Sequence, residues 1–191
     1  AAMVKELREM TGAGMMDCKK ALTETNGDMD AAVDVLKKSG AAKMEKKQSR
    51  IAAEGIARVA VNGNVAVVAE VNSETDFVAK NETFQEFVQT VADTALASDL
   101  NGGANGEDIE ALLATNGLSD LLVEKTATIG EKLSVRRFAK VTGDAVASYI
   151  HGGGRIGVVI AADGASDDAA KEALTNIAMQ VAAMNPQYIL S

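Results

Sequence analysis

Two short apolar runs joined by a tight-turn signal constrain the fold of this chain most strongly. Residues 56–61 and 65–71 are rich in β-branched side chains, and Asn62-Gly63 lies between them. This dipeptide is preferred where both central residues of a tight hairpin need positive φ. We therefore expect an antiparallel hairpin at this point.

A helix is predicted after the hairpin, over residues 83–98, because apolar side chains recur there with helical spacing. They are Phe84, Phe87, Val88, Val91 and Ala95. The connection before this helix, residues 75–81, has the sequence TDFVAKN, so Phe77 stands among polar and charged neighbours. Connections lie on the surface and often carry function. Spacing alone favours Phe77 packing back onto its own sheet over Phe77 projecting towards a partner.

The following part of the chain alternates helical and strand patterns. We expect a surface loop over 101–106, helices over 107–115 and 118–128, and strands over 133–141, 145–150 and 156–162. Residues 64–68 are similar to residues 155–159, which indicates a repeat of strand, loop and helix. The predicted fold class is α+β, with an antiparallel or mixed sheet and helices packed on one of its faces.

Three short helices are predicted at the start of the chain. Helical patterns cover residues 3–10 and 15–25, and a third helix is expected between a capping residue, Asp28, and a stop signal, Gly40. We predict a ubiquitin-associated-like three-helix module over 1–40, a basic helical connector over 41–54 and an α+β core domain over 55–191.

The charge and composition of the chain limit the kinds of partner that it can bind. The 191 residues carry a net charge of -8, which disfavours a phosphate backbone as the main partner, and their 47% hydrophobic content supports a folded core. Residues 1–50 contain ten basic and eight acidic side chains, whereas the remainder contains nine and nineteen. The single cysteine, Cys18, and the absence of a signal or spanning segment predict a cytoplasmic protein.

Motifs for nucleotide, metal or covalent chemistry are not supported by their context. Residues 152–157 match G-x-G-x-x-G but open a predicted strand, whereas a dinucleotide site needs that pattern to open a helix. His151 and the glycines after it imitate an esterase segment, yet no G-x-S-x-G sequence occurs. One histidine and one cysteine do not make a usual zinc site. We predict no catalytic residue, no metal and no cofactor.

Two separated motifs carry a resemblance to a known family. Residues 75–81 and residues 11–20, of sequence TGAGMMDCKK, resemble the bacterial elongation factor Ts family in the correct order. The resemblance implies a guanine-nucleotide exchange factor that binds elongation factor Tu and promotes release of GDP, with neither membrane nor nucleic acid as a direct partner. Members usually continue past a segment like residues 185–186, so we expect this chain to be truncated.

The resemblance also implies contact residues. In the N-terminal module, which docks on the partner's GTPase domain, these are Met15, Met16 and Lys19. In the exchange motif, which approaches the helices beside the nucleotide pocket and disturbs the magnesium site, they are Thr75, Asp76, Phe77 and Val78. Further positions at or beside this interface are Ile129, Gly130 and His151.

Two other functions stay open at this stage. Residues 37–50 are rich in lysine and arginine and would suit an RNA-binding or ribosome-associated adaptor without exchange activity. The absence of an aromatic stacking platform on the predicted strands argues against RNA. An enzyme is the third alternative, and it would require a site that the sequence does not display.

Overall fold

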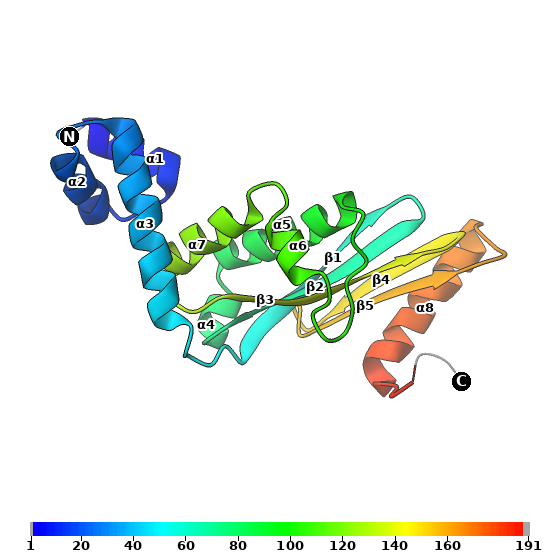
Figure 1. The fold of residues 1–191 in the computed structure, drawn as a ribbon. Helices are drawn as coiled ribbons and strands as arrows, with labels where there is room; N and C mark the ends of the chain where they lie inside the picture. The colour runs from blue at the N-terminus through cyan, green and yellow to red at the C-terminus, as the bar shows by residue number, and fades with distance from the viewer. Residues whose placement is uncertain (1, 189–191) are drawn as a thin grey trace.

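The computed structural model describes residues 2–188, which form a helical N-terminal module joined by one long helix to a layered α+β core (Figure 1). The core has four layers: a helix, a three-stranded sheet, a two-stranded sheet and a second helix. Their elements are, in that order, α5 (Glu82–Ala97), β1 (Glu54–Asn62) with β2 (Val65–Ser73) and β3 (Ser134–Thr142), β4 (Ala145–His151) with β5 (Ile156–Ala162), and α8 (Asp168–Met184). The α+β class is confirmed.

The predicted hairpin is present, but its turn lies one residue further along the chain. Asn62 pairs with Val65 as part of the strands, so the two loop residues are Gly63 and Asn64. Gly63 has φ of 58°, whereas Asn64 is not among the residues with positive φ. A glycine at the first loop position with an ordinary second residue is typical of a type II′ turn, not of the type I′ turn that Asn-Gly favours.

The main core lies between α5 and the three-stranded sheet. Alternate residues of β2, namely Val67, Ala69 and Val71, are buried on the side of the sheet that packs against α5. Three phenylalanines fill the same cluster and are at most 1% exposed: Phe84, Phe87 and Phe138. Burial of one such side chain contributes about 1.5–3 kcal/mol, so this cluster dominates the stability of the core.

The β4–β5 hairpin crosses the other face of the three-stranded sheet, and α8 covers the hairpin from outside. The two sheets approach closely at Gly157, where a Cβ atom would lie 2.9 Å from Ala57 and from Val68. Our prediction of a single sheet is therefore wrong, because the strands form two stacked sheets, each with a helix packed on its outer face. The predicted repeat corresponds to two hairpin-and-helix units: β1 and β2 with α5, and β4 and β5 with α8.

The N-terminal module consists of α1 (Ala2–Thr11), α2 (Met15–Glu24) and the first half of α3 (Met29–Lys47). Its small core contains Leu7, Cys18, Ala21, Leu22 and Ala32. Asp28 caps α3 as predicted, because its side chain accepts a hydrogen bond from the Ala31 amide at 3.0 Å.

Gly40 does not end the third helix, which corrects the predicted stop. The residue is buried within α3, where a Cβ atom would lie 3.2 Å from Val123 of α7 (Leu118–Ile129). The missing side chain lets two helices approach closely, and α3 carries the chain from the module onto the core. The remaining helices are α4 (Asp76–Ala79) and α6 (Ile109–Leu113), and no helix within residues 2–188 is long and apolar enough to cross a membrane.

Candidate protein-interaction site

Phe77 is the most unusual apolar side chain of the core domain. It is 81% exposed, whereas the other three phenylalanines of the chain are buried. A side chain of this size left in water forgoes about 1.5–3 kcal/mol of burial energy. The packing expected from spacing alone is therefore wrong, and Phe77 projects outwards.

The four residues of α4 divide between the core and the solvent. Thr75 is the N-cap, and its hydroxyl accepts a long hydrogen bond of 3.4 Å from the Val78 amide. Val78 packs against the main core and Ala79 is buried, which anchors the helix. Asp76 and Phe77 take the outer positions. Within the exchange motif, Thr75 and Val78 therefore hold the helix in place, and Asp76 and Phe77 are exposed.

Asp76 forms an ion pair with Lys80, one helical turn away, at 2.8 Å. This hydrogen bond and the charge of the ammonium hold the pKa of the Asp76 carboxyl below its ordinary value. Asp76 is therefore ionised at neutral pH. It places a negative charge beside the exposed ring of Phe77.

Glu131 fixes the segment that leads into α4. Its Oε2 accepts hydrogen bonds from the amides of Glu74 and Thr75, both at 3.0 Å, and its Oε1 accepts one from the Thr75 hydroxyl at 2.6 Å. Hydrogen bonds to an ionised acceptor are about twice as strong as neutral ones. One carboxylate therefore holds two consecutive residues just before Phe77.

Glu74 makes the reciprocal contact. Its carboxylate accepts a 2.6 Å hydrogen bond from the Lys132 amide and is paired with Arg50 at 3.2 Å. The Lys132 amide, followed by Arg50, holds the pKa of Glu74 below its ordinary value. Lys132 in turn donates from Nζ to the carbonyl oxygens of Gln48, at 2.6 Å, and Arg50, at 2.9 Å. We call Arg50, Glu74, Glu131 and Lys132 the polar junction.

Ile129 and Gly130 lie directly beside this junction. Ile129 is half-buried against the main core at the end of α7, and Gly130 is the C-cap with φ of 87°. This left-handed conformation favours glycine, and it turns the chain so that Glu131 reaches Thr75. The fold thus brings Ile129 and Gly130 next to the exchange motif.

His151 lies at the end of β4, beside the turn into β5. It is exposed, and its Nδ1 is 3.0 Å from the hydroxyl of Tyr149. Two side chains, Arg58 and Gln85, connect this turn to α4 by hydrogen bonds. Arg58 donates to the carbonyl oxygen of Gly153 at 3.3 Å and to the side chain of Gln85 at 3.0 Å. Gln85 in turn donates to the carbonyl oxygen of Ala79, in α4, at 3.3 Å. His151 is therefore connected to the exchange motif only through intermediates.

Met15, Met16 and Lys19 form a second exposed surface, on α2. The two methionines are 60% and 74% exposed, and Lys19 lies one turn after Met15 on the same side of the helix. Among the described residues, Lys19 has no ion-pair partner within 4 Å. We call these three residues the α2 surface.

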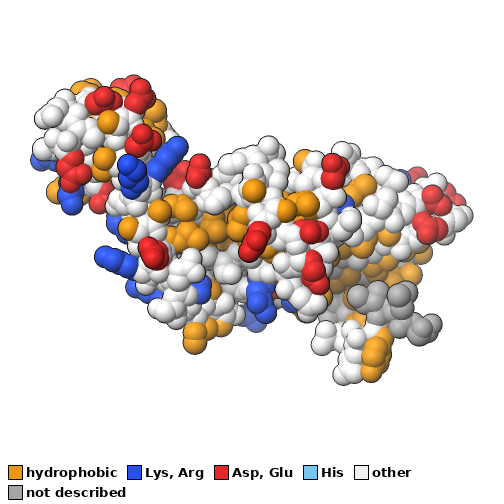
Figure 2. All heavy atoms as spheres, in the orientation of Figure 1, with side chains coloured by type: hydrophobic (Ala, Val, Ile, Leu, Met, Phe, Trp, Pro, Cys, Tyr) orange, Lys and Arg blue, Asp and Glu red, His pale blue; other side chains and the backbone are white. Residues whose placement is uncertain are grey.

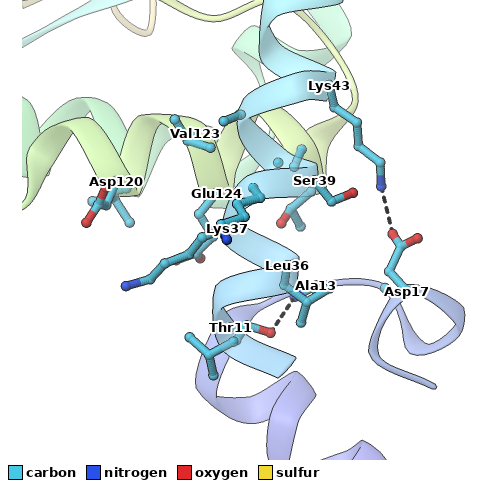
Figure 3. Close-up of a pocket in the computed structure, with 18 of the residues that line it drawn as sticks. Thr11, Ala13, Asp17, Leu36, Lys37, Ser39, Lys43, Asp120, Val123 and Glu124 are labelled. Carbon is cyan, nitrogen blue, oxygen red and sulfur yellow. Dashed lines mark hydrogen bonds and ion pairs between the residues drawn. The ribbon is translucent and has the colours of Figure 1, made fainter. Parts of the chain in front are cut away.

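An open groove of about 600 Å³ separates the N-terminal module from the core. Figure 3 shows Val123 and Glu124 of α7 beside α3, and Lys43 of α3 pointing away from them, towards Asp17 of α2. Figure 2 shows hydrophobic side chains exposed where α3 approaches α7. An ion pair between Lys43 and Asp17, at 2.8 Å, connects α3 to α2 beside the groove, where the apolar core of the module also packs these two helices together.

The polar junction was not predicted from the sequence. Glu131 and Glu74 are 57 residues apart, and no spacing rule connects positions so distant. The only available signal was that Glu131 directly follows Ile129 and Gly130, which the resemblance had already indicated. Within residues 2–188, no group of three His, Cys, Asp or Glu side chains is arranged to hold a metal ion.

The fold and the site are typical of a protein that binds another macromolecule: a helical module and an α+β core each present exposed apolar side chains. A family model described as Elongation factor TS matches residues 74–191, and the chain belongs to that family. Members of the family are nucleotide exchange factors for elongation factor Tu, not enzymes that make or break covalent bonds. The match begins at Glu74 and includes the whole exchange motif.

Proposed function

We propose that this protein promotes release of GDP from elongation factor Tu through two contacts. The α2 surface docks on the GTPase domain, and Asp76 and Phe77 press towards the helices beside the nucleotide pocket, where they disturb the magnesium and phosphate site. The observation that carries the proposal is the 81% exposure of Phe77 on an anchored four-residue helix.

Linkage explains why such a protein needs no reactive group. A factor that binds the nucleotide-free partner more tightly than the GDP-bound partner must weaken GDP binding by the same factor. A rigid aromatic side chain suits this role because it loses little side-chain entropy on contact. Its insertion excludes one conformation of the partner and favours another.

The RNA-binding alternative is weakened by the contacts of the basic segment. Lys43 is paired with Asp17, and Arg50 is paired with Glu74. These cations already have carboxylate partners, which reduces the positive field available for a phosphate backbone. Lys37 and Lys38 are exposed, but they line the same groove as two acidic residues of α7, Asp120 and Glu124.

A stopped-flow experiment tests the proposal. Elongation factor Tu loaded with a fluorescent GDP analogue is mixed with excess unlabelled GDP and increasing amounts of the protein. We expect the release rate to rise with protein concentration and then to saturate. A release rate that stays at its spontaneous value across the titration, or capture of RNA without acceleration, would contradict the proposal.

A further inference from the structure

We propose that Glu131 is a positioning residue for nucleotide exchange, which holds the segment before α4 so that Phe77 is presented in one orientation. The proposal rests on the proposed function. Glu131 contacts Glu74 and Thr75, which precede α4, and not Phe77 itself, so its role differs from that of a contact residue.

The hydrogen-bond geometry supports this role. Helix α4 has only four residues, which is too short to be stable by itself, so its orientation depends on what holds its ends. The C-terminal end continues through Asn81, which caps α5 by accepting from the Phe84 amide at 3.1 Å. At the N-terminal end, the three hydrogen bonds to Glu131 connect the segment to another part of the chain.

The polar junction extends this restraint to the segment after α3. Lys132 binds the carbonyls of Gln48 and Arg50, and Arg50 binds the carboxylate of Glu74. The chain leaving the N-terminal module therefore meets the chain entering α4 at Glu74. This arrangement fixes Phe77 relative to the helix that carries the module, and both contacts can then be made without further ordering.

Two substitutions of Glu131 test the proposal in the stopped-flow assay. Glu131→Ala removes both acceptor oxygens and with them all three hydrogen bonds. We expect the maximal rate of GDP release to fall about 10- to 100-fold, since small misplacements of a positioned group cost up to that much. The half-saturating protein concentration should change less, because the α2 surface is intact. Glu131→Gln keeps one acceptor oxygen for the backbone amides and gains an NH₂ group that can donate to the Thr75 hydroxyl. This variant should therefore retain most of the wild-type rate.

A double substitution shows whether Glu131 acts through Phe77 or affects the protein independently of it. If Glu131 acts through Phe77, then Glu131→Ala added to Phe77→Ala should change the release rate by less than about twofold. An equal loss in both backgrounds, or a normal rate for Glu131→Ala alone, would overturn the proposal. The matched control is Glu107→Ala, since Glu107 also accepts a hydrogen bond from a loop amide, that of Asn105 at 2.9 Å, away from α4.

Amide hydrogen exchange of the free protein gives a result that does not depend on the partner. Glu131→Ala should speed exchange of the amides in residues 75–80, whereas Glu107→Ala should leave them unchanged. Unchanged protection in Glu131→Ala would overturn the positioning role even if the wild-type protein accelerates GDP release. If the wild-type protein does not accelerate release, the proposed function fails, and the hydrogen exchange still decides whether Glu131 holds the segment.

Discussion

The exchange motif and the α2 surface both expose apolar side chains, but they hold them in opposite ways. Phe77 lies on the short helix α4. The carboxylate of Glu131 binds the backbone just before this helix, and Val78, the residue after Phe77, packs against the main core. Met15 and Met16 lie on a helix of a small module, and each side chain has three rotatable bonds. One surface is preorganised and the other is adaptable.

The difference indicates a division of tasks. We expect a ring on a restrained backbone to displace a helix of the partner, because little of its binding free energy is spent on ordering the side chain. Flexible methionines adapt to a surface and add affinity without requiring one geometry. On this basis, damage to the exchange motif should lower the maximal exchange rate, and damage to the module should mainly weaken binding.

The largest effect is expected for Phe77→Ala. Loss of a buried interfacial aromatic typically costs about 2–4 kcal/mol, so stimulated GDP release should slow roughly 30- to 1,000-fold in stopped-flow measurements. The melting temperature of the free protein should not change, since the ring is 81% exposed. Phe87→Ala is the matched control: this ring is buried, and its loss should cost about 3–5 kcal/mol of folding stability. A lowered melting temperature with normal exchange for Phe77→Ala would show that Phe77 stabilises its own fold and does not act on the partner.

Gly40→Leu should have the next largest effect, on binding. A side chain at this buried position meets Val123 and pushes α3 away from α7, so the α2 surface moves relative to Phe77. We expect about tenfold weaker binding of elongation factor Tu by calorimetry and a stability loss of about 1–3 kcal/mol from overpacking. Ala41→Leu is the control because residue 41 is exposed on the same helix. Equal affinities for the two variants would show that the module position does not matter.

Glu74→Gln tests how firmly the exchange motif is held. The folded-state pKa of Glu74 lies below its ordinary value of 4.5, so the ionised form stabilises the folded protein above that pH. We expect a loss of about 1 kcal/mol at pH 7, or roughly 2–4 °C in Tm. The difference between variant and wild type should shrink as the pH falls through the lowered pKa. A difference that is the same at pH 7 and pH 3 would mean that the charge of Glu74 does not contribute.

Lys19→Ala is expected to have the smallest effect. An exposed charge at the rim of an interface acts mainly on association, so the association rate should fall about two- to fivefold with a weaker salt dependence, and dissociation should change little. Lys171→Ala in α8 removes the same charge elsewhere on the surface. If both variants slow association equally, the effect belongs to net charge and not to the α2 surface.

Local patterns predicted most of the elements. The hairpin of β1 and β2, the amphipathic α5 and α7, and the cap at Asp28 all depend on interactions within a few residues, so their signals are visible in a short stretch of sequence. Apart from the hairpin turn, which was placed one residue too early, the predictions that failed concern longer distances. Gly40 is a common stop signal, but here its missing side chain makes room for α7, whose identity as a neighbour the local sequence does not reveal.

The candidate site shows the same limit. Resemblance identified residues 75–81 and 129–130 separately, and their proposed roles stay predictions, but nothing local indicated that Glu131 connects them. Spacing also placed Phe77 on the wrong side, because an aromatic residue beside a strand usually packs onto the sheet. Only the folded structure distinguishes this exposed ring from the buried rings of Phe84, Phe87 and Phe138.

The sequence by itself determined the α+β class, the order of helices and strands and the position of the exposed connection, because hydrophobic periodicity and capping act over one or two turns of chain. Only the tertiary structure decided that two sheets stack, that α3 runs on to α7, and that Glu74 and Glu131 hold each other's segments. These features depend on volumes and hydrogen-bond partners supplied by residues far apart in the chain, and such pairs have no fixed spacing.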